Sequence, residues 1–200
     1  MSKLSRLARY ELLECIAPAL YGAIEKRCDV VSREIVAVKR VEMRYAAARR
    51  AKDSQRAVEE DVFKELETNL RLRSLGGHPH VVALRDCFID ADSDAVFLVT
   101  EFCERGDLLA VVNARSTSLA PSEALQLMFQ IVSGVAFLHA HGIAHRDLSL
   151  ENILVDAVGD CKIGDFGMAT SERETQATGI GKVHYMAPEA ITSKSSRRRN

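Results

Sequence analysis

The sequence predicts an α+β chain, with strands gathered mainly in its first half and helix dominating its second half. Three observations support this class. β-branched and aromatic residues recur from Tyr10 to Arg40 and again from Val81 to Cys103, which is typical of short strands. An amphipathic stretch, Pro121–His141, reads as a long helix followed by Gly142. The linker TEFCERGD, residues 100–107, changes from apolar to polar where two unequal halves would meet.

Composition excludes several classes of protein. The 200 residues fit one domain or two small lobes of one domain, and the formal net charge of -1 provides no overall field for nucleic acid or an anionic membrane. The N-terminus has no continuous apolar run, so we expect neither a secretory signal nor a membrane-spanning start. The five scattered cysteines lack paired spacing and indicate reduced thiols, which favours the cytoplasm or the nucleus.

In the first half, the clearest strand is REIVAVKR, which ends at Arg40. The stretch Glu42–Leu75 contains neither Gly nor Pro and reads as one helix, which GGHPH then ends. Two strand-like runs, VVALRDCFI and AVFLVTEFC, follow around the turn DADSD. The apolar stripe of the helix is expected at Val58, Val62, Leu66 and Leu70.

In the second half, two short apolar runs follow the long helix. NILV and CKIGDF resemble two strands around the turn DAVGD. The last seven residues, KSSRRRN, are expected to be a solvated end rather than a basic binding patch. The sequence contains no internal repeat.

Four short motifs occur in a fixed order. VAVK ends in Lys39, HRDLSLEN supplies Asp147 and Asn152, DFG begins at Asp165, and APE ends at Glu189. Each motif alone is weak, but together they resemble the eukaryotic protein kinase domain of the serine/threonine type. The resemblance implies a two-lobed protein-kinase-like fold, with a β-rich N-lobe over about 1–102, a linker at 103–106 and a helical C-lobe over 107–200. Family members continue into further helices, so this C-lobe is expected to be incomplete and the helix Pro121–His141 to expose apolar surface.

The resemblance implies ATP and Mg²⁺ as cofactors and a protein hydroxyl as substrate. Phosphoryl transfer needs charge neutralised and atoms aligned. Asp165 and Asn152 offer hard oxygen ligands for Mg²⁺. Asp147 would orient the substrate hydroxyl and accept its proton, and Lys39 would hold the α- and β-phosphates.

Lys39 needs a carboxylate partner on the helix that follows it. The candidates in the sequence are Glu59, Glu60, Glu65 and Glu67. Glu65 is favoured because it lies next to Leu66 beside the apolar stripe. Glu67 is the alternative, because the GGHP segment carries extra residues relative to the family.

The stretch VTEFCERGD resembles the adenine-binding strand and linker of the family. Thr100 would guard the back pocket, the carbonyl of Glu101 and the amide of Cys103 would bond adenine, and Asp107 would reach the ribose. The positions that would sandwich the adenine ring are Ile24, Ala37 and Leu154, for which ordinary core packing is the alternative.

The chain departs from the family at two functional positions. The nucleotide-covering loop reads APALYGAI, so of its three glycines only Gly22 remains, and we expect weaker nucleotide binding. Ser149 stands where the family has a phosphate-binding lysine, and Lys182 stands where the family has a threonine. One hypothesis is that the two residues have exchanged roles and that Lys182 supplies the charge. The alternative is an exposed Lys182 beside an impaired site.

The segment between DFG and APE suggests regulation. Thr178 matches the common phosphorylation position of the family, and a phosphate there would pair with Arg146, which implies an upstream kinase. An unmodified polar loop is the alternative. The stretch Met43–Ala57 is either a basic docking surface or a solvated helical face. No nucleic-acid or membrane partner is expected.

Two interpretations of function remain at this point. The first is an ATP- and Mg²⁺-dependent protein kinase that acts on serine or threonine hydroxyls. The second is a catalytically impaired pseudokinase, or kinase fragment, that binds nucleotide or a partner protein. The four motif residues of the site favour the first, whereas the altered loop, Ser149 and the incomplete C-lobe favour the second.

Overall fold

The computed structural model describes residues 6–54, 61–171 and 181–188. The chain divides into two compact units, which are described separately. Unit 1 comprises Met1–Gly76 and Ala83–Cys103, and unit 2 comprises Gly77–Val82 and Glu104–Asn200. The boundary expected near residue 102 lies beside the end of unit 1, whereas the short stretch Gly77–Val82 belongs to unit 2.

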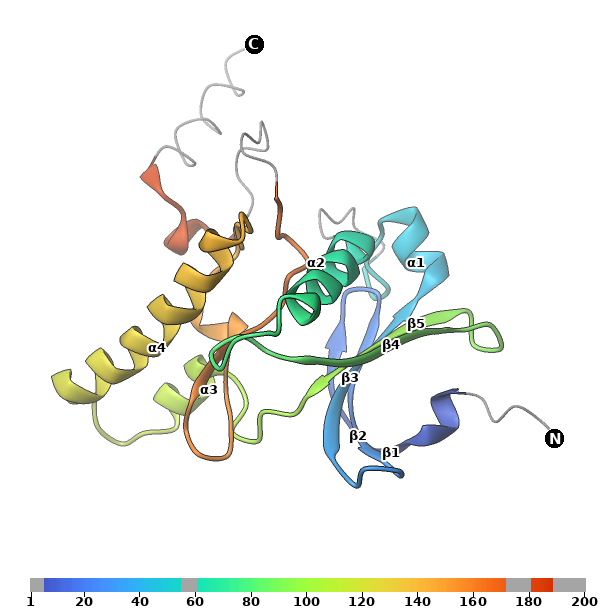
Figure 1. Ribbon diagram of the computed structural model, residues 1–200, viewed down its shortest axis with the longest axis horizontal. Helices are drawn as coiled ribbons and strands as arrows, with labels where there is room; N and C mark the ends of the chain where they lie inside the picture. The colour runs from blue at the N-terminus through green and yellow to red at the C-terminus, as the bar shows by residue number, and fades with distance from the viewer. Residues whose placement is uncertain (1–5, 55–60, 172–180, 189–200) are drawn as a thin grey trace, which may run out of the picture. The chain divides into compact units, whose positions relative to one another are not determined.

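Unit 1 is built on a five-stranded antiparallel sheet with the strand order β1-β2-β3-β5-β4 (Figure 1). A 3₁₀ turn, η1 (Arg6–Arg9), leads into the first strand. The strands are β1 (Tyr10–Ala19), β2 (Gly22–Asp29), β3 (Ile35–Glu42), β4 (Leu84–Asp90) and β5 (Ala95–Glu101). The α+β class expected from the sequence is therefore confirmed, with the strands where the β-branched runs placed them.

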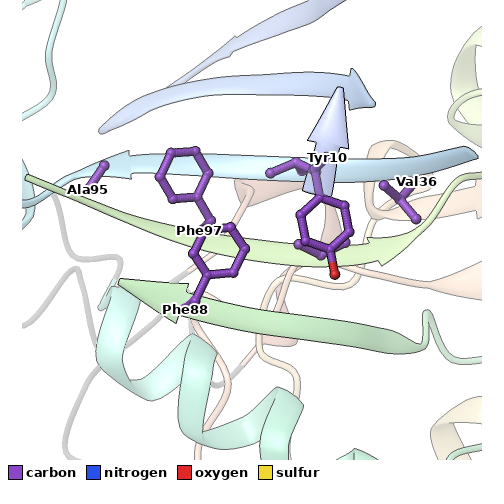
Figure 2. Close-up of a cluster of buried hydrophobic side chains, with 7 residues drawn as sticks. Tyr10, Val36, Phe88, Ala95 and Phe97 are labelled. Carbon is purple, nitrogen blue, oxygen red and sulfur yellow. The ribbon is translucent and has the colours of Figure 1, made fainter. Parts of the chain in front are cut away.

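One face of the sheet carries an aromatic cluster (Figure 2). Phe88 of β4 stacks on Phe97 of β5, with ring centroids 5.1 Å apart, and on Tyr10 of β1 at 5.9 Å. Val36 and Val38 of β3 lie in the same cluster. Because side chains alternate along a strand, Ala37 and Lys39 belong to the opposite face. The opposite face therefore carries a separate set of side chains, which includes Lys39 and part of a second buried cluster with Val41 and Leu98.

The single helix expected over Glu42–Leu75 is wrong, because two helices occupy this stretch. α1 (Met43–Ala48) ends where Arg49 takes a left-handed conformation, with φ of 50°. α2 (Val62–Ser74) begins after Asp61, whose side chain accepts hydrogen bonds from the backbone N–H groups of the first turn. An aspartate that accepts such bonds is typical of the start of a helix, so Asp61 is the residue that marks the start of α2 in the sequence.

The expected apolar stripe of this region needs correction as well. The residues of α2 that are buried are Val62, Glu65, Asn69 and Leu72. Leu70, expected inside, is 44% exposed, and Val58 lies outside the described residues. The helix is rotated because its inward face carries two polar groups, the paired carboxylate of Glu65 and the amide of Asn69, which a search for apolar residues cannot detect.

Unit 2 combines helices with a small two-stranded sheet. Its helices are α3 (Leu108–Asn113) and α4 (Pro121–Ala140), and its strands are β6 (Ile153–Val155) and β7 (Cys161–Ile163), which pair antiparallel. Two 3₁₀ turns, η2 (Leu150–Asn152) and η3 (Val183–Tyr185), complete the described part. α3 was not expected from the sequence, and Asp107 caps its first turn by accepting from the N–H of Ala110.

The long helix expected at Pro121–His141 is confirmed as α4. Pro121 is its first residue, where proline is favoured, and Gly142 follows its end with φ of 67°. α4 packs against β7, and Gly134 permits a close approach because a Cβ there would lie 2.6 Å from the carbonyl oxygen of His80.

The outer face of α4 exposes apolar side chains, as expected. These are Leu125, Met128, Phe129 and Val132. In the part of the chain that the structure describes, α4 is also the helix long and apolar enough to cross a membrane by length and composition alone. Core helices pass the same test, so this is weak evidence for a membrane span.

Candidate active site

Lys39 lies in the middle of the sheet of unit 1, on the face opposite the aromatic cluster. In the register of the sheet, Lys39 pairs with Ile24 of β2 and with Leu98 of β5. Residues directly opposite one another in antiparallel strands share a face. The same rule places Thr100 beside Ala37, and the hydroxyl of Thr100 donates to the carbonyl oxygen of Ala37 at 3.4 Å. Four residues expected to contact nucleotide therefore share one face.

The structure pairs Lys39 with Glu65. The ammonium of Lys39 lies 2.8 Å from the carboxylate of Glu65, and the two side chains are only 17% and 6% exposed. Glu67 is on the exposed side of α2, so this alternative does not meet Lys39. Glu59 and Glu60 lie outside the described residues. A buried ion pair of this kind fixes the direction of both side chains, because breaking it would strand a charge away from water.

The residues expected to bond adenine close the end of unit 1. Glu101 is the last residue of β5, and its carboxylate accepts from the backbone N–H of Ala83 at 2.8 Å. The backbone N–H of Glu101 in turn donates to the carbonyl of Ala83. Cys103 is buried. These two hydrogen bonds join the end of β5 to Ala83.

Gly22 starts β2 and is the glycine retained from the nucleotide-covering loop. A Cβ at this position would lie 1.9 Å from the carbonyl oxygen of Arg40, so no other residue fits while β2 keeps its place. The glycine therefore has a packing reason within the sheet in addition to any role toward a phosphate.

In unit 2, the loop that precedes β6 holds Asp147 through two neighbours. The amide nitrogen of Asn152 donates to the carbonyl oxygen of Asp147 at 2.6 Å and to its carboxylate at 2.9 Å. The backbone N–H of Asp147 donates to Nδ1 of His145 at 3.3 Å. These bonds orient the carboxylate that the sequence predicts to be the proton acceptor.

His145 is the first residue of HRDLSLEN, and the structure gives it contacts that the sequence motif does not specify. Because its Nδ1 accepts a hydrogen bond, its Nε2 carries the proton and donates to the carbonyl oxygen of Gly164 at 2.8 Å. Burial lowers the pKa of His145 below its usual value, which keeps the ring neutral. The ring also packs against Phe166, with centroids 5.4 Å apart. His145 thereby joins the Asp147 loop to the segment that carries Asp165.

Asp165 and Asn152 fit the requirements of a magnesium site. The backbone of Asp165 is left-handed, with φ of 57°, and its carboxylate accepts from the N–H of Gly167 at 3.3 Å. Since the side-chain nitrogen of Asn152 donates to Asp147, the side-chain oxygen of Asn152 faces away from that carboxylate. Among the described residues no group of three or more His, Cys, Asp or Glu side chains gathers for a metal. Mg²⁺ normally takes only one or two protein oxygens and completes its shell with phosphates and water, so the absence of a larger acidic cluster among these residues is compatible with the predicted ligands Asp165 and Asn152.

Lys182 and Ser149 lie together. The ammonium of Lys182 donates to the hydroxyl of Ser149 at 2.6 Å and lies 3.5 Å from the carboxylate of Glu151. Ser149 is buried, whereas Lys182 is 39% exposed. The pKa of Glu151 lies below its usual value, chiefly because its own backbone N–H donates to the carboxylate, with Ser149 and Lys182 adding to the effect. Ser149 and Lys182 are thus in direct contact.

Gly181, directly before Lys182, leaves room for the contact between Lys182 and Ser149. It has φ of 94°, and a Cβ at this position would lie 2.6 Å from the carbonyl oxygen of Arg146 and 3.3 Å from the carboxylate of Asp147. Only glycine therefore lets the segment before Lys182 approach the Asp147 loop so closely.

The remaining predicted residues are Leu154, Asp107, Arg146 and Thr178. Leu154 forms an isolated bridge with Asp107, but the carboxylate of Asp107 caps α3, a use that the sequence prediction of ribose binding did not consider. Arg146 donates to the carbonyl of Met168 at 2.6 Å. Thr178 lies outside the described residues.

Comparison with known proteins agrees with this geometry. Residues 10–199 match the family model described as the protein kinase domain. The chain is 32% identical over 188 residues to NUAK family SNF1-like kinase 2 of Homo sapiens, covering 93% of this chain and 28% of that protein. It is 40% identical over 134 residues to serine/threonine-protein kinase PLK4 of Nematostella vectensis, covering 66% of this chain and 13% of that protein. The chain thus spans less than a third of the length of these two relatives. The match over nearly all of its residues, together with the paired Lys39 and the oriented Asp147, places the chain in the protein kinase family.

Proposed function

We propose that the chain transfers the γ-phosphoryl group of ATP, with Mg²⁺, to serine or threonine hydroxyls of proteins. The observation that carries this proposal is the pair of hydrogen bonds by which Asn152 orients Asp147. Asn152 thereby orients the carboxylate of Asp147, the proposed proton acceptor, and leaves its own side-chain oxygen for a metal ion. The name of the PLK4 relative, a serine/threonine-protein kinase, supports the serine/threonine class.

Each unit contributes its own groups to the proposed reaction. Mg²⁺-bound ATP supplies the phosphoryl group. Asp147 would orient the substrate hydroxyl and accept its proton, while Asn152 and Asp165 would hold the metal. In unit 1, Lys39 binds the α- and β-phosphates, and its pair with Glu65 keeps the ammonium aimed.

The adenosine-binding residues follow the family resemblance. In unit 1, adenine would be bonded by the backbone of Glu101 and Cys103, guarded by Thr100, and packed by the apolar side chains of Ile24 and Ala37. In unit 2, Leu154 packs on adenine, and Asp107 binds the ribose with the carboxylate oxygen that does not cap α3.

Lys182 is proposed to contact the γ-phosphate in place of the lysine that the family carries at the Ser149 position. The 2.6 Å bond to Ser149 supports this role because it brings the ammonium to the loop that holds Asp147. Lys182→Ala should therefore lower kcat by about 10²- to 10³-fold, the usual loss when one donor to a reacting group is removed. Lys182→Arg serves as the control that keeps a cation, and activity unchanged in Lys182→Ala would overturn the role.

The proposed regulation involves Thr178 and Arg146. A phosphate added to Thr178 by an upstream kinase would offer Arg146 a charged partner. Phosphosite mapping of active protein tests this, and an active protein with unmodified Thr178 would exclude it. The cytoplasm or nucleus is the proposed location.

The pseudokinase interpretation is less favoured. Lys39, Asp147, Asn152 and Asp165 are all present, and the similar proteins are named as kinases. The distinguishing experiment incubates the purified chain with labelled ATP, Mg²⁺ and a mixed protein substrate, beside Asp165→Asn. Label on serine or threonine with the parent chain and none with the variant is the expected result. Equal labelling by both would refute the proposed function.

A further inference from the structure

We propose that Tyr21 is a positioning residue that fixes the turn between β1 and β2 to the same packed body that holds Lys39 and Glu65. The proposal rests on the proposed function, since this turn belongs to the stretch expected to cover the nucleotide. Leu20 and Tyr21 form the turn, and the strand pairing continues to Ala19 and Gly22 on either side. A large aromatic residue at a hairpin turn is normally exposed, yet Tyr21 is 1% exposed.

The surroundings of Tyr21 explain its burial. It belongs to a buried cluster that draws residues from β3, α1, α2 and β5, namely Val41, Ala46, Val62, Val96 and Leu98. Leu66 of α2 packs against this cluster. Val62 and Leu66 lie on either side of Glu65 in α2, and Leu98 is the register partner of Lys39. The cluster containing the ring of Tyr21 therefore includes the neighbours of both members of the ion pair.

Main-chain bonds hold the same turn on both of its residues. The carbonyl oxygen of Tyr21 accepts from the N–H of Glu42 at 2.9 Å, and that of Leu20 accepts from the N–H of Lys52 at 2.7 Å. Figure 1 shows the tip of the β1–β2 hairpin beside α2, in agreement with the shared cluster. Glu42, which precedes α1, and Lys52, which follows it, thus fix the turn through their backbone N–H groups.

This arrangement offsets the loss of flexible glycines in the loop. Ala17 and Ala19 replace two glycines, so the backbone has less freedom to adapt to phosphates. A turn that is already held in place loses less conformational entropy when a nucleotide binds. The anchor also links the turn to α2, because a shift of α2 away from Lys39 would disturb the cluster that buries Tyr21. The segment Met43–Ser54 therefore has a role within unit 1, in addition to the two alternatives, docking surface or solvated helical face, that the sequence left open for Met43–Ala57.

Two pairs of variants test the anchor through nucleotide affinity. Tyr21→Ala removes the ring, and Tyr21→Phe keeps it. Lys52→Pro removes the N–H donor to Leu20, whereas Lys52→Arg keeps both that N–H and a cation beside Glu42, with which the Lys52 ammonium pairs at 2.7 Å. We expect Tyr21→Ala and Lys52→Pro to raise the KM for ATP by about tenfold or more, with kcat and the KM for protein substrate changed far less. The two controls should stay within about twofold of the parent chain.

A purely structural role would give a different result. It would lower the fraction of active protein, so kcat per mole of chain would fall while the KM for ATP stayed constant, and that outcome overturns the proposal. Hydrogen exchange without nucleotide gives a second readout. Tyr21→Ala should speed exchange at the turn amides and in the first turns of α2, whereas unchanged exchange would contradict the link to α2.

If the parent chain binds Mg²⁺-ATP by calorimetry but transfers no label, the proposed function fails. The anchor is then judged by the dissociation constant of Mg²⁺-ATP in the same four variants. A parent chain that binds no nucleotide overturns both proposals.

Discussion

Replacing Glu65 by glutamine should be the most informative change in unit 1. The substitution removes one charge of a 2.8 Å ion pair whose two side chains are 17% and 6% exposed, and it leaves the ammonium of Lys39 buried. Removing one partner of a buried pair costs about 3–5 kcal/mol. Solvent access to Lys39 favours the lower end, about 3 kcal/mol. At about 2–4 °C per kcal/mol for a chain of this size, Tm should fall by about 6–12 °C.

The same change should impair catalysis, because Lys39 loses the contact that aims it. We expect kcat/KM for ATP to fall by about 10²-fold, the cost of a misplaced binding group. Calorimetric melting and steady-state kinetics of Glu65→Gln measure both effects. Glu67→Gln is the matched control two residues along the same helix, on its exposed side. If the two variants behave alike in both assays, the reasoning from the ion pair is wrong.

Three further predictions follow from contacts elsewhere in the chain. The double variant Ser149→Lys with Lys182→Thr restores the family arrangement, and in a labelled-ATP assay it should keep at least about a tenth of the parent activity. Lys182→Thr alone should lose about 10²-fold in activity. Equal loss in the two variants would contradict the exchange of roles. Gly181→Ala forces a Cβ to within 2.6 Å of the carbonyl of Arg146, so kcat should fall by at least about tenfold, and parent-like kinetics would show that the approach is not required. The hydrogen bond from Arg9, aided by Val31 and Ser32, holds the pKa of Asp29 well below its ordinary value of 3.8. Because the pKa of Asp29 is depressed in the folded state, its stabilising effect is present above pH 3.8 and is lost as the pH falls below that value. In Asp29→Asn, the free energy of unfolding measured by urea titration should therefore depend less on pH in the acid range. The same pH dependence in variant and parent would refute this.

The motif residues could be predicted from sequence because their identity and order are set by chemistry. Lys39 lies on a strand, Asp147 and Asp165 lie in loops, and Asn152 ends the 3₁₀ turn η2, and at such places a short motif is enough to locate a residue. The choice between Glu65 and Glu67 was harder, because it depends on the rotation of α2. That rotation follows from burying two polar groups, and polarity patterns normally place such groups outside.

Other features depended on contacts between distant parts of the chain. The end of α1 at Arg49 could not be predicted because Glu42–Leu75 has no Gly or Pro. The chain leaves the helix there and returns to the β1–β2 turn, where the N–H of Lys52 bonds to the carbonyl of Leu20. The burial of Tyr21 follows from that return and has no local signal. The capping role of Asp107 was available from the sequence, since an aspartate before an apolar run is typical of a helix start.

The central claim is that Asp147, oriented by Asn152, makes this chain an enzyme rather than a nucleotide-binding module. The most direct measurement compares the parent chain with Asp147→Asn for Mg²⁺-ATP binding by calorimetry and for single-turnover transfer of label to protein. The account predicts that the two bind nucleotide within about threefold of each other, whereas the variant transfers label at least about 10²-fold more slowly. Equal transfer by both, or none by a parent chain that binds Mg²⁺-ATP, would contradict it.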